Sequence, residues 1–183
     1  MKVTPTALPE VLLIEPDVFG DERGFFMESW NARTFREATG LDVTFVQDNH
    51  SRSARNVLRG IHYQVIKPQG KLVRVVAGAV FDVAVDLRRA SPNFAKWVGV
   101  ELSAENKRQL WIPPGFGHAF LALSEWTDFL YKTTEYWFSG LDRCVRWDDP
   151  SIGVAWPLKA SAPLLSLKDA AAAFLESGDV FEG

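Results

Sequence analysis

The stretch NHSRSARNVLRGIHYQ, residues 49–64, gathers chemically active side chains within an otherwise apolar part of the chain. It contains His50 and His62, two of the chain's three histidines, and it places Arg59 on the same short segment as His62. Positive groups near an apolar core cost free energy through desolvation unless an anion binds beside them. The stretch therefore predicts a site for an anionic ligand, in which the imidazoles bind a metal, hold hydrogen bonds or carry protons.

The histidines fit a metal site only in part. Metal-binding barrels of the cupin type commonly carry two histidines two residues apart on one strand, then a carboxylate, and a third histidine on a later strand. His62 stands where that pair would lie, but Tyr63 and Gln64 do not supply the second ligand. His118 and His50 could still converge on it from other strands. A purely structural hydrogen-bonding role is the other alternative, above all for His50.

Proton transfer is the third possibility, and the sequence offers every residue type that it needs. A base that removes a carbon-bound proton requires a group that orients it and an electrophile that holds the resulting negative charge. His62 is the candidate base, and Lys71 or a neighbouring arginine could stabilise an enolate. Tyr131 could return a proton from the other face, and Asp169 could hold His62 in its working tautomer.

The elements that must position these side chains are short strands separated by turn signals. Alternation in FDVAVD indicates a half-buried strand, and DVFGDERG is typical of a loop. NARTFREATG predicts a short helix that ends at Gly40, and SLKDAAAAFLE predicts a short C-terminal helix packed on the sheet. Nine or more strands at this spacing predict an all-β sandwich or barrel. The predicted strands lie in VLLIEP, FFMESW, VTFVQDNHS, VLRGIHYQ, GKLVRVVAG, AVFDVAVDLR, WVGVELS, RQLWIPPG, HAFLALS, WTDFLYKTTEYW and CVRWDDP.

Composition limits the class of protein. With 183 residues, 47% hydrophobic, the chain is expected to form one domain over residues 1–183. Its net charge of −3 favours neither nucleic acid nor an anionic membrane as partner. Pro5 and Pro9 interrupt the N-terminal segment, and no apolar run approaches the ~20 residues of a membrane span, so a cytoplasmic protein is expected. The single cysteine, Cys144, is expected to be an ordinary strand residue without chemistry.

Seven fragments, in this order, resemble the dTDP-4-dehydrorhamnose 3,5-epimerase family over nearly the whole chain. They are FGDERGFFMESW, FVQDNHSRSARNVLRGIHYQ, GKLVRVVAGAVFDVAVDLRRASPNF, WIPPGFGHAFLALSE, YKTTEYW, VRWDDP and LLSLKDA. The resemblance implies an all-β, cupin-type jelly-roll barrel with short peripheral helices, a homodimer, and no metal or cofactor. It implies the substrate dTDP-4-dehydro-6-deoxy-D-glucose and the product dTDP-4-dehydro-L-rhamnose. The ketone at carbon 4 acidifies the protons on carbons 3 and 5, and each can be removed to give an enolate and returned on the opposite face.

The resemblance also implies roles for individual residues. His62 matches the base, Asp169 its partner, Tyr131 the proton donor and Lys71 the lysine near the keto oxygen. Arg23 resembles the arginine that reaches the diphosphate, together with Phe26, across the dimer interface; such a guanidinium matches phosphate oxygens. The substrate-binding positions are matched by Arg23, Phe26, Glu28, Gln47, Asn49, Arg59, His118, Trp137, Asp142 and Lys168.

Aromatic residues and three departures from the family pattern bear on the nucleotide. Phe19, Phe26 and Trp137 are candidates to stack on thymine, although Phe19 fits an ordinary core aromatic at least as well. Asp142 stands where glutamate is common and Trp137 where tyrosine is common; Asn56 replaces a frequent glycine and tolerates the same left-handed backbone. Three functions remain as alternatives to the 3,5-epimerase: a mono-epimerase of a related dTDP-4-keto-deoxysugar, a metal-dependent cupin enzyme, and a non-catalytic sugar-binding jelly roll.

Overall fold

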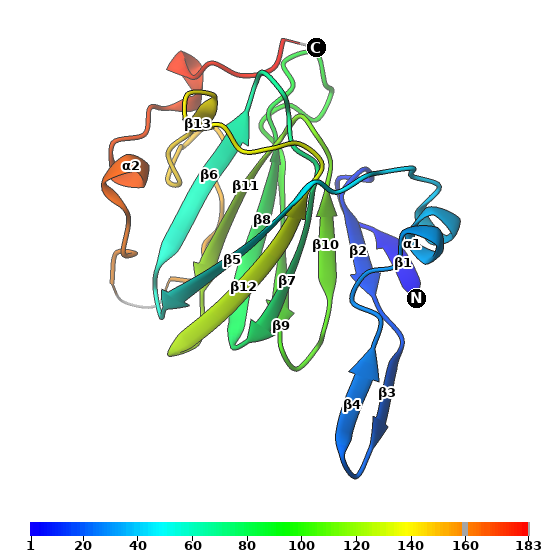
Figure 1. Ribbon diagram of the computed structural model, residues 1–183. Coiled ribbons are helices and arrows are strands. Elements are labelled where there is room, and N and C mark those ends of the chain that lie inside the picture. The colour runs from blue at the N-terminus through cyan, green and yellow to red at the C-terminus, as the bar shows by residue number, and fades with distance from the viewer. Residues whose placement is uncertain (159–160, 183) are drawn as a thin grey trace.

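Two antiparallel β-sheets that face each other form the body of the molecule in the computed structural model, which describes residues 1–158 and 161–182 (Figure 1). In sheet order, the six-stranded sheet contains β1 (Lys2–Pro5), β2 (Leu12–Glu15), β10 (Gln109–Ile112), β7 (Lys71–Ala77), β12 (Trp126–Thr133) and β5 (Gln47–Ala54). The five-stranded sheet contains β13 (Asp142–Cys144), β6 (Leu58–Gln64), β11 (Phe116–Ala122), β8 (Ala79–Asp86) and β9 (Trp97–Ser103). The strands from β5 to β8 and from β9 to β13 alternate between the two sheets, and β8 and β9 pair within one of them, so the fold is the predicted cupin-type jelly roll.

The main core lies between the two sheets and contains Val73, Leu110 and Phe129 from one sheet and Val80 and Phe120 from the other. The prediction that FDVAVD forms a half-buried strand is wrong, because β8 is buried on both faces. Its outward residues pack in a second cluster, against apolar side chains of the C-terminal segment such as Val180 and Phe181. This packing of the C-terminal segment on β8 places it beside β6, which carries the candidate base His62.

The helix predicted at NARTFREATG is α1 (Ala32–Thr39), and its ends are those that the sequence indicates. The side chain of Asn31 accepts hydrogen bonds from two first-turn amides, and Gly40 ends the helix at φ 73°. The helix predicted at SLKDAAAAFLE is mostly wrong, since α2 is only Leu167–Ala170 and a 3₁₀ turn follows at Leu175–Ser177. Ala173 instead pairs with Val145 as an isolated bridge, and the amide of Leu175 donates to Asp149.

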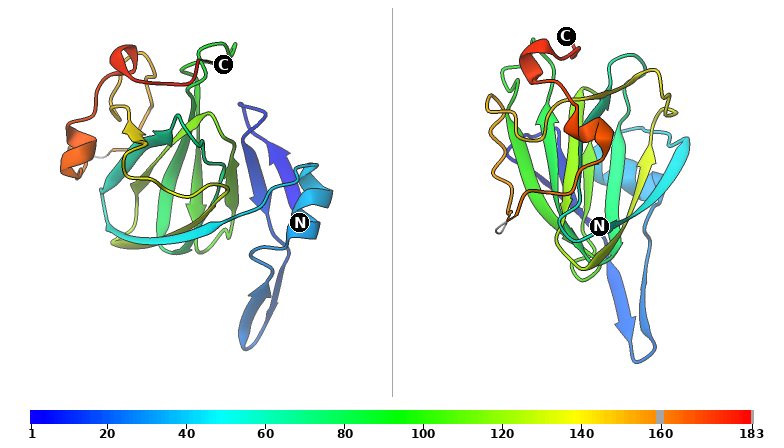
Figure 2. Two further views of the ribbon diagram at one scale, coloured as in Figure 1. Left: turned by 45° about the horizontal axis from the view of Figure 1, so that its top comes forward. Right: turned by 90° about the vertical axis from the view of Figure 1, so that its left-hand side faces the viewer.

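The segment DVFGDERG is not a plain loop. It contains β3 (Val18–Asp21) and the start of β4 (Gly24–Met27), which form a separate two-stranded hairpin. Gly24 has φ 131°, a backbone conformation that residues with a Cβ rarely adopt. The hairpin projects away from the sandwich, as the turned views of Figure 2 also show. It leaves the aromatic rings of Phe19, Phe25 and Phe26 exposed.

Candidate active site

A cavity of about 320 Å³ opens between the two sheets, with walls formed by β5, β7 and β12 on one side and β6 and β11 on the other. Its lining joins residues that are far apart in the sequence and includes most of those predicted for the site. The predicted residues that line it are Asn49, Arg59, His62, Lys71, His118, Tyr131, Trp137 and Asp142. The opening stretch therefore supplies part of both walls, as β5 and β6.

His62, on β6 of the five-stranded sheet, and Asp169, on α2, form a hydrogen-bonded pair. Nε2 of His62 lies 2.5 Å from Oδ1 of Asp169, whose side chain is only 3% exposed. Ser166 fixes the carboxylate, because its hydroxyl donates to Oδ2 at 2.8 Å and accepts from the backbone amide of Asp169 at the start of α2. Burial opposes the charge on Asp169, but hydrogen bonds from His62 and Ser166 lower its pKa below the ordinary value.

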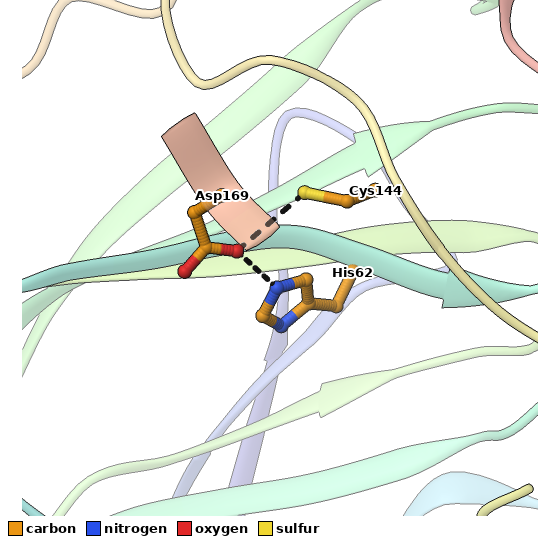
Figure 3. Close-up of side chains that lie close together, drawn as sticks. All are labelled: His62, Cys144 and Asp169. Atoms are coloured by element: carbon orange, nitrogen blue, oxygen red, sulfur yellow. Dashed lines mark hydrogen bonds and ion pairs between the residues drawn. The ribbon is translucent and has the colours of Figure 1, made fainter. Parts of the chain in front are cut away.

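This contact determines which nitrogen of His62 can act as a base. A neutral imidazole carries one N–H and one lone pair, and an ionised carboxylate only accepts hydrogen bonds. Asp169 therefore keeps the proton on Nε2 and leaves the lone pair on Nδ1. Figure 3 shows the second ring nitrogen directed away from Asp169. The pair thus has the arrangement of a general base with its orienting carboxylate.

Cys144 lies beside this pair, which sequence reasoning missed. Its Sγ is 3.6 Å from Oδ1 of Asp169, and the strand register sets Cys144 directly opposite His62 (Figure 3). Burial and the neighbouring carboxylate raise the pKa of Cys144 to about 12, so it is a neutral thiol near pH 7. No signal in CVRWDDP reveals the contact, because it depends on the pairing of β13 with β6.

Lys71 is the buried cation of the cavity. Lys71 is the first residue of β7, and its Nζ lies 3.4 Å from the carbonyl oxygen of His62. Burial lowers its pKa to about 8, although the carboxylates of Asp142 and Asp82 act in the opposite direction. Near neutral pH the ammonium form predominates. A buried positive charge beside the cavity is well suited to stabilise an oxyanion.

Tyr131 stands on the wall opposite His62. It belongs to β12, where it pairs with Asn49 of β5. Burial raises the pKa of Tyr131 above its ordinary value, so that its hydroxyl keeps its proton at neutral pH. The cavity therefore has a hydroxyl donor on the six-stranded sheet and an imidazole base on the five-stranded sheet.

Each of the three histidines is held by a carboxylate of its own. His118 is paired with buried Asp82 at 2.9 Å, and His50 lies 3.0 Å from Asp128. Burial lowers the pKa of His118, so its neutral form contacts the cavity. Asp82 thus has a structural role as the hydrogen-bonding partner of His118. Within residues 1–158 and 161–182, the metal-capable side chains that converge are His62, Cys144 and Asp169, rather than the three histidines.

Several predicted binding residues are connected around the cavity. Gln47 donates to Asn49 at 2.8 Å and accepts from the backbone amide of Trp137, so β5 holds the loop that carries the indole. Arg59 donates to the hydroxyl of Ser53 at 3.0 Å. Asp142 forms an ion pair with Lys168, so the shorter acidic side chain still spans from β13 to α2.

Five predicted binding residues do not line this cavity: Gln47 and Lys168 bond to residues that do, whereas Arg23, Phe26 and Glu28 do not. Arg23 and Phe26 belong to the projecting hairpin, where Arg23 pairs with Asp21. The carboxylate of Glu28 accepts from the side chain of Asn31 just after the hairpin. Within one chain, then, these residues are not brought together with His62.

None of the described helices is long and apolar enough to cross a membrane.

Comparison with known proteins agrees with this geometry. The family model described as dTDP-4-dehydrorhamnose 3,5-epimerase matches residues 5–177. The chain is 60% identical to the dTDP-4-dehydrorhamnose 3,5-epimerase of Pseudomonas aeruginosa over 99% of both chains, and 59% identical to that of Salmonella typhimurium over 96% of both. It is also similar, with a TM-score of 0.96 and 49% identity, to the Legionella pneumophila dTDP-6-deoxy-D-glucose-3,5-epimerase in complex with dTDP-4-keto-L-rhamnose, over 100% of this chain and 98% of that one. A cavity with a histidine–aspartate pair facing a tyrosine, and relatives this close over their full length, place the chain in the dTDP-4-dehydrorhamnose 3,5-epimerase family.

Proposed function

We propose that the chain is a cofactor-independent epimerase that inverts carbons 3 and 5 of dTDP-4-dehydro-6-deoxy-D-glucose. The product is dTDP-4-dehydro-L-rhamnose, an intermediate of dTDP-L-rhamnose biosynthesis. The observation that carries this proposal is that a base, His62, and a hydroxyl donor, Tyr131, stand on opposite walls of one cavity. Inversion of a carbon requires that a proton leave from one face and return to the other.

The proposed reaction uses the residues in a defined order. Nδ1 of His62 takes the proton from the carbon next to the ketone, and the bonding electrons move onto the carbon 4 oxygen. The ammonium of Lys71 stabilises the enolate, while Asp169 stabilises the imidazolium. Tyr131 then donates its proton to the opposite face of the same carbon. Exchange with solvent removes the proton from His62 and returns one to Tyr131. The cycle changes no oxidation state, because the carbon loses one proton and gains another.

The remaining residues are proposed to hold the nucleotide sugar. Arg59 and Asn49 bind its polar groups from β6 and β5, and neutral His118 contacts the sugar from β11. Trp137 stacks on the thymine ring at the cavity mouth. Gln47 holds the Trp137 loop, and the Asp142–Lys168 pair closes the side next to α2.

Deuterium exchange tests the proposed reaction directly. The pure protein in heavy water is expected to place deuterium on both carbon 3 and carbon 5 of dTDP-4-dehydro-6-deoxy-D-glucose, because each proton passes through an enolate. Mass spectrometry and NMR of the recovered sugar measure this. Label on one carbon alone would support a mono-epimerase instead. A complete lack of exchange would favour a different substrate or the sugar-binding module.

Replacement of Tyr131 by phenylalanine separates the two proton transfers. The variant keeps His62, Asp169 and Lys71, so exchange of deuterium into the starting sugar is expected to continue. Formation of the inverted product is expected to fall by about 10²-fold or more, because the donor on the opposite face is lost. The ratio of exchange to inversion, followed by NMR, is the measurement. An unchanged ratio would show that another group returns the proton.

We further propose that the chain acts as a homodimer through the β3–β4 hairpin. Phe19, Phe25 and Phe26 are between 61% and 68% exposed on a hairpin that projects from the sandwich, and such apolar surface is typical of a protein interface. A second copy would cover these rings and receive Arg23 near its diphosphate site, which accounts for the position of Arg23 outside its own cavity. Residues 1–183 would then form one domain per subunit of a cytoplasmic enzyme.

Two variants separate assembly from binding. Replacing Phe19 and Phe25 by serine is expected to shift the molecule from dimer to monomer, because the apolar rings would lose their cover. Light scattering on a size-exclusion column measures this. Replacing Arg23 by alanine removes the guanidinium but leaves the apolar rings in place, so the dimer is expected to persist while KM rises. A wild-type protein that elutes as a monomer at every concentration would contradict the proposed interface.

A further inference from the structure

The donor atoms of His62, Cys144 and Asp169 all lie within 4.8 Å of one another and come from three separate elements, β6, β13 and α2. Figure 3 shows the thiol and the imidazole directed at the same carboxylate oxygen. The proposed epimerisation uses two of these side chains and has no step for the thiol. An imidazole, a thiol and a carboxylate are, as a set, the ligands that Zn²⁺ takes from proteins.

We propose that this cluster is an inhibitory Zn²⁺ site, in which the ion binds Nε2 of His62, Sγ of Cys144 and Oδ1 of Asp169. A water molecule completes the tetrahedron, as in other sites with three protein ligands. On binding, the thiol releases its proton to solvent and Asp169 is already ionised. The site takes a borderline-soft cation and excludes Mg²⁺, which prefers six oxygen ligands.

The distances between the donor atoms suit this ion after a small adjustment. Zn–S bonds of about 2.3 Å and Zn–N or Zn–O bonds of about 2.0–2.1 Å set tetrahedral donor atoms about 3.3–3.6 Å apart. Sγ already lies 3.6 Å from Oδ1. The imidazole and the carboxylate, now 2.5 Å apart, must separate by nearly 1 Å to replace the shared proton with the ion. The four-residue helix α2 carries Asp169, so this requires the movement of one short element.

Inhibition follows from which ring nitrogen of His62 carries the proton. In the dyad, Nε2 holds the proton and Nδ1 holds the lone pair that removes a proton from the substrate. Zn²⁺ on Nε2 takes up that nitrogen's lone pair, and the single proton of a neutral imidazole then resides on Nδ1. The base is blocked by this change of tautomer, and α2, which carries Asp169, is the element that moves. This inhibitory part rests on the proposed function, whereas the binding part does not.

Cobalt provides a test of binding that needs no activity. Co²⁺ is expected to bind the whole protein once per chain and to show the near-ultraviolet charge-transfer band of a cobalt–thiolate bond, which added Zn²⁺ should displace. Cys144→Ser keeps a hydrogen-bond donor beside Asp169 but removes the thiolate, so the band should vanish. His50→Ala is the matched control, because His50 is also paired with a carboxylate but has no place in the proposed site. A wild-type protein without the band would overturn the proposal.

Inhibition is then measured as the Zn²⁺ concentration that halves each protein's own initial rate. Loss of the soft ligand is expected to raise this concentration by roughly tenfold or more in Cys144→Ser and Cys144→Ala. Equal sensitivity in all three proteins would overturn the inhibitory site and would point to chelation of the substrate diphosphate. A cobalt–thiolate band in a protein that does not turn over the sugar would uphold the metal site and reject only the proposed function.

Discussion

Replacement of His62 by alanine is expected to lower kcat by about 10²- to 10⁴-fold, which is what a positioned general base contributes. KM is expected to change much less, because Arg59, Asn49 and Trp137 remain around the cavity. Deuterium exchange at carbons 3 and 5 should be lost together with turnover, since both begin with the same proton removal. Initial rates and NMR exchange, measured on the same preparation, give the two quantities.

Asp169→Asn is the informative companion of this variant. The amide has nearly the size of the carboxylate but carries no charge, so it no longer stabilises an imidazolium and can present an N–H to Nε2. We expect its kcat to fall in the same direction as that of His62→Ala, with dTDP binding retained in both. If His62→Ala kept its rate within about tenfold of the wild type, a group other than His62 would have to be the base.

Lys71 is expected to set the alkaline limit of activity. Burial lowers its pKa from 10.5 to about 8, so the ammonium form that stabilises the enolate is present below that pH and is lost as the pH rises through it. The rate constant kcat/KM should therefore decline above about pH 8. Lys71→Arg keeps its charge throughout this range and should abolish the decline, although its shape lowers the maximum rate. A pH profile of both proteins from acid to alkaline conditions is the measurement.

Lys71→Met removes the charge at every pH and is expected to reduce kcat by roughly 10²- to 10³-fold, as for other oxyanion-stabilising groups. Stability should not fall with it. A buried lysine whose folded pKa lies below its unfolded value binds fewer protons when folded, so its ionised form opposes folding at neutral pH and this effect is relieved as the pH rises from about 8. Thermal unfolding therefore distinguishes lost catalysis from lost structure. A decline above pH 8 that persisted in Lys71→Met would assign the limit to another group.

The sequence predicts an all-β sandwich or barrel for a physical reason, whereas a family resemblance implied the jelly roll and the roles proposed for four residues: His62, Lys71, Tyr131 and Asp169. Alternating apolar residues and turn signals are local properties, and His62, Lys71, Tyr131 and Asp169 belong to segments whose order resembles a known family. The opening stretch is also local, since a short connection carries the chain from Asn49 on β5 to Arg59 on β6, in the facing sheet. These features need little knowledge of how distant segments pair.

The features that were missed or wrongly predicted all depend on how distant segments pair. The contact of Cys144 with the dyad depends on the pairing of β13 with β6, and neither segment contains information about its partner's register. The alanine run favours a helix by intrinsic propensity, but Ala173 pairs with Val145 instead, so tertiary contacts override propensity. The second buried face of β8 arises from the distant residues Val180 and Phe181.

The attachment of the C-terminal segment has a consequence for folding and local opening. His62 and Asp169 are 107 residues apart, so the base obtains its partner only when the last part of the chain docks on the completed sandwich. That docking depends on a few contacts, among them the bridge from Ala173 to Val145, the bond from Leu175 to Asp149 and the packing of Phe181 on Tyr63. Segments held by few contacts open at lower free energy than the core. We therefore expect the contact between His62 and Asp169 to open at a lower free energy than the core strands, so that activity declines under milder denaturation than the fold does.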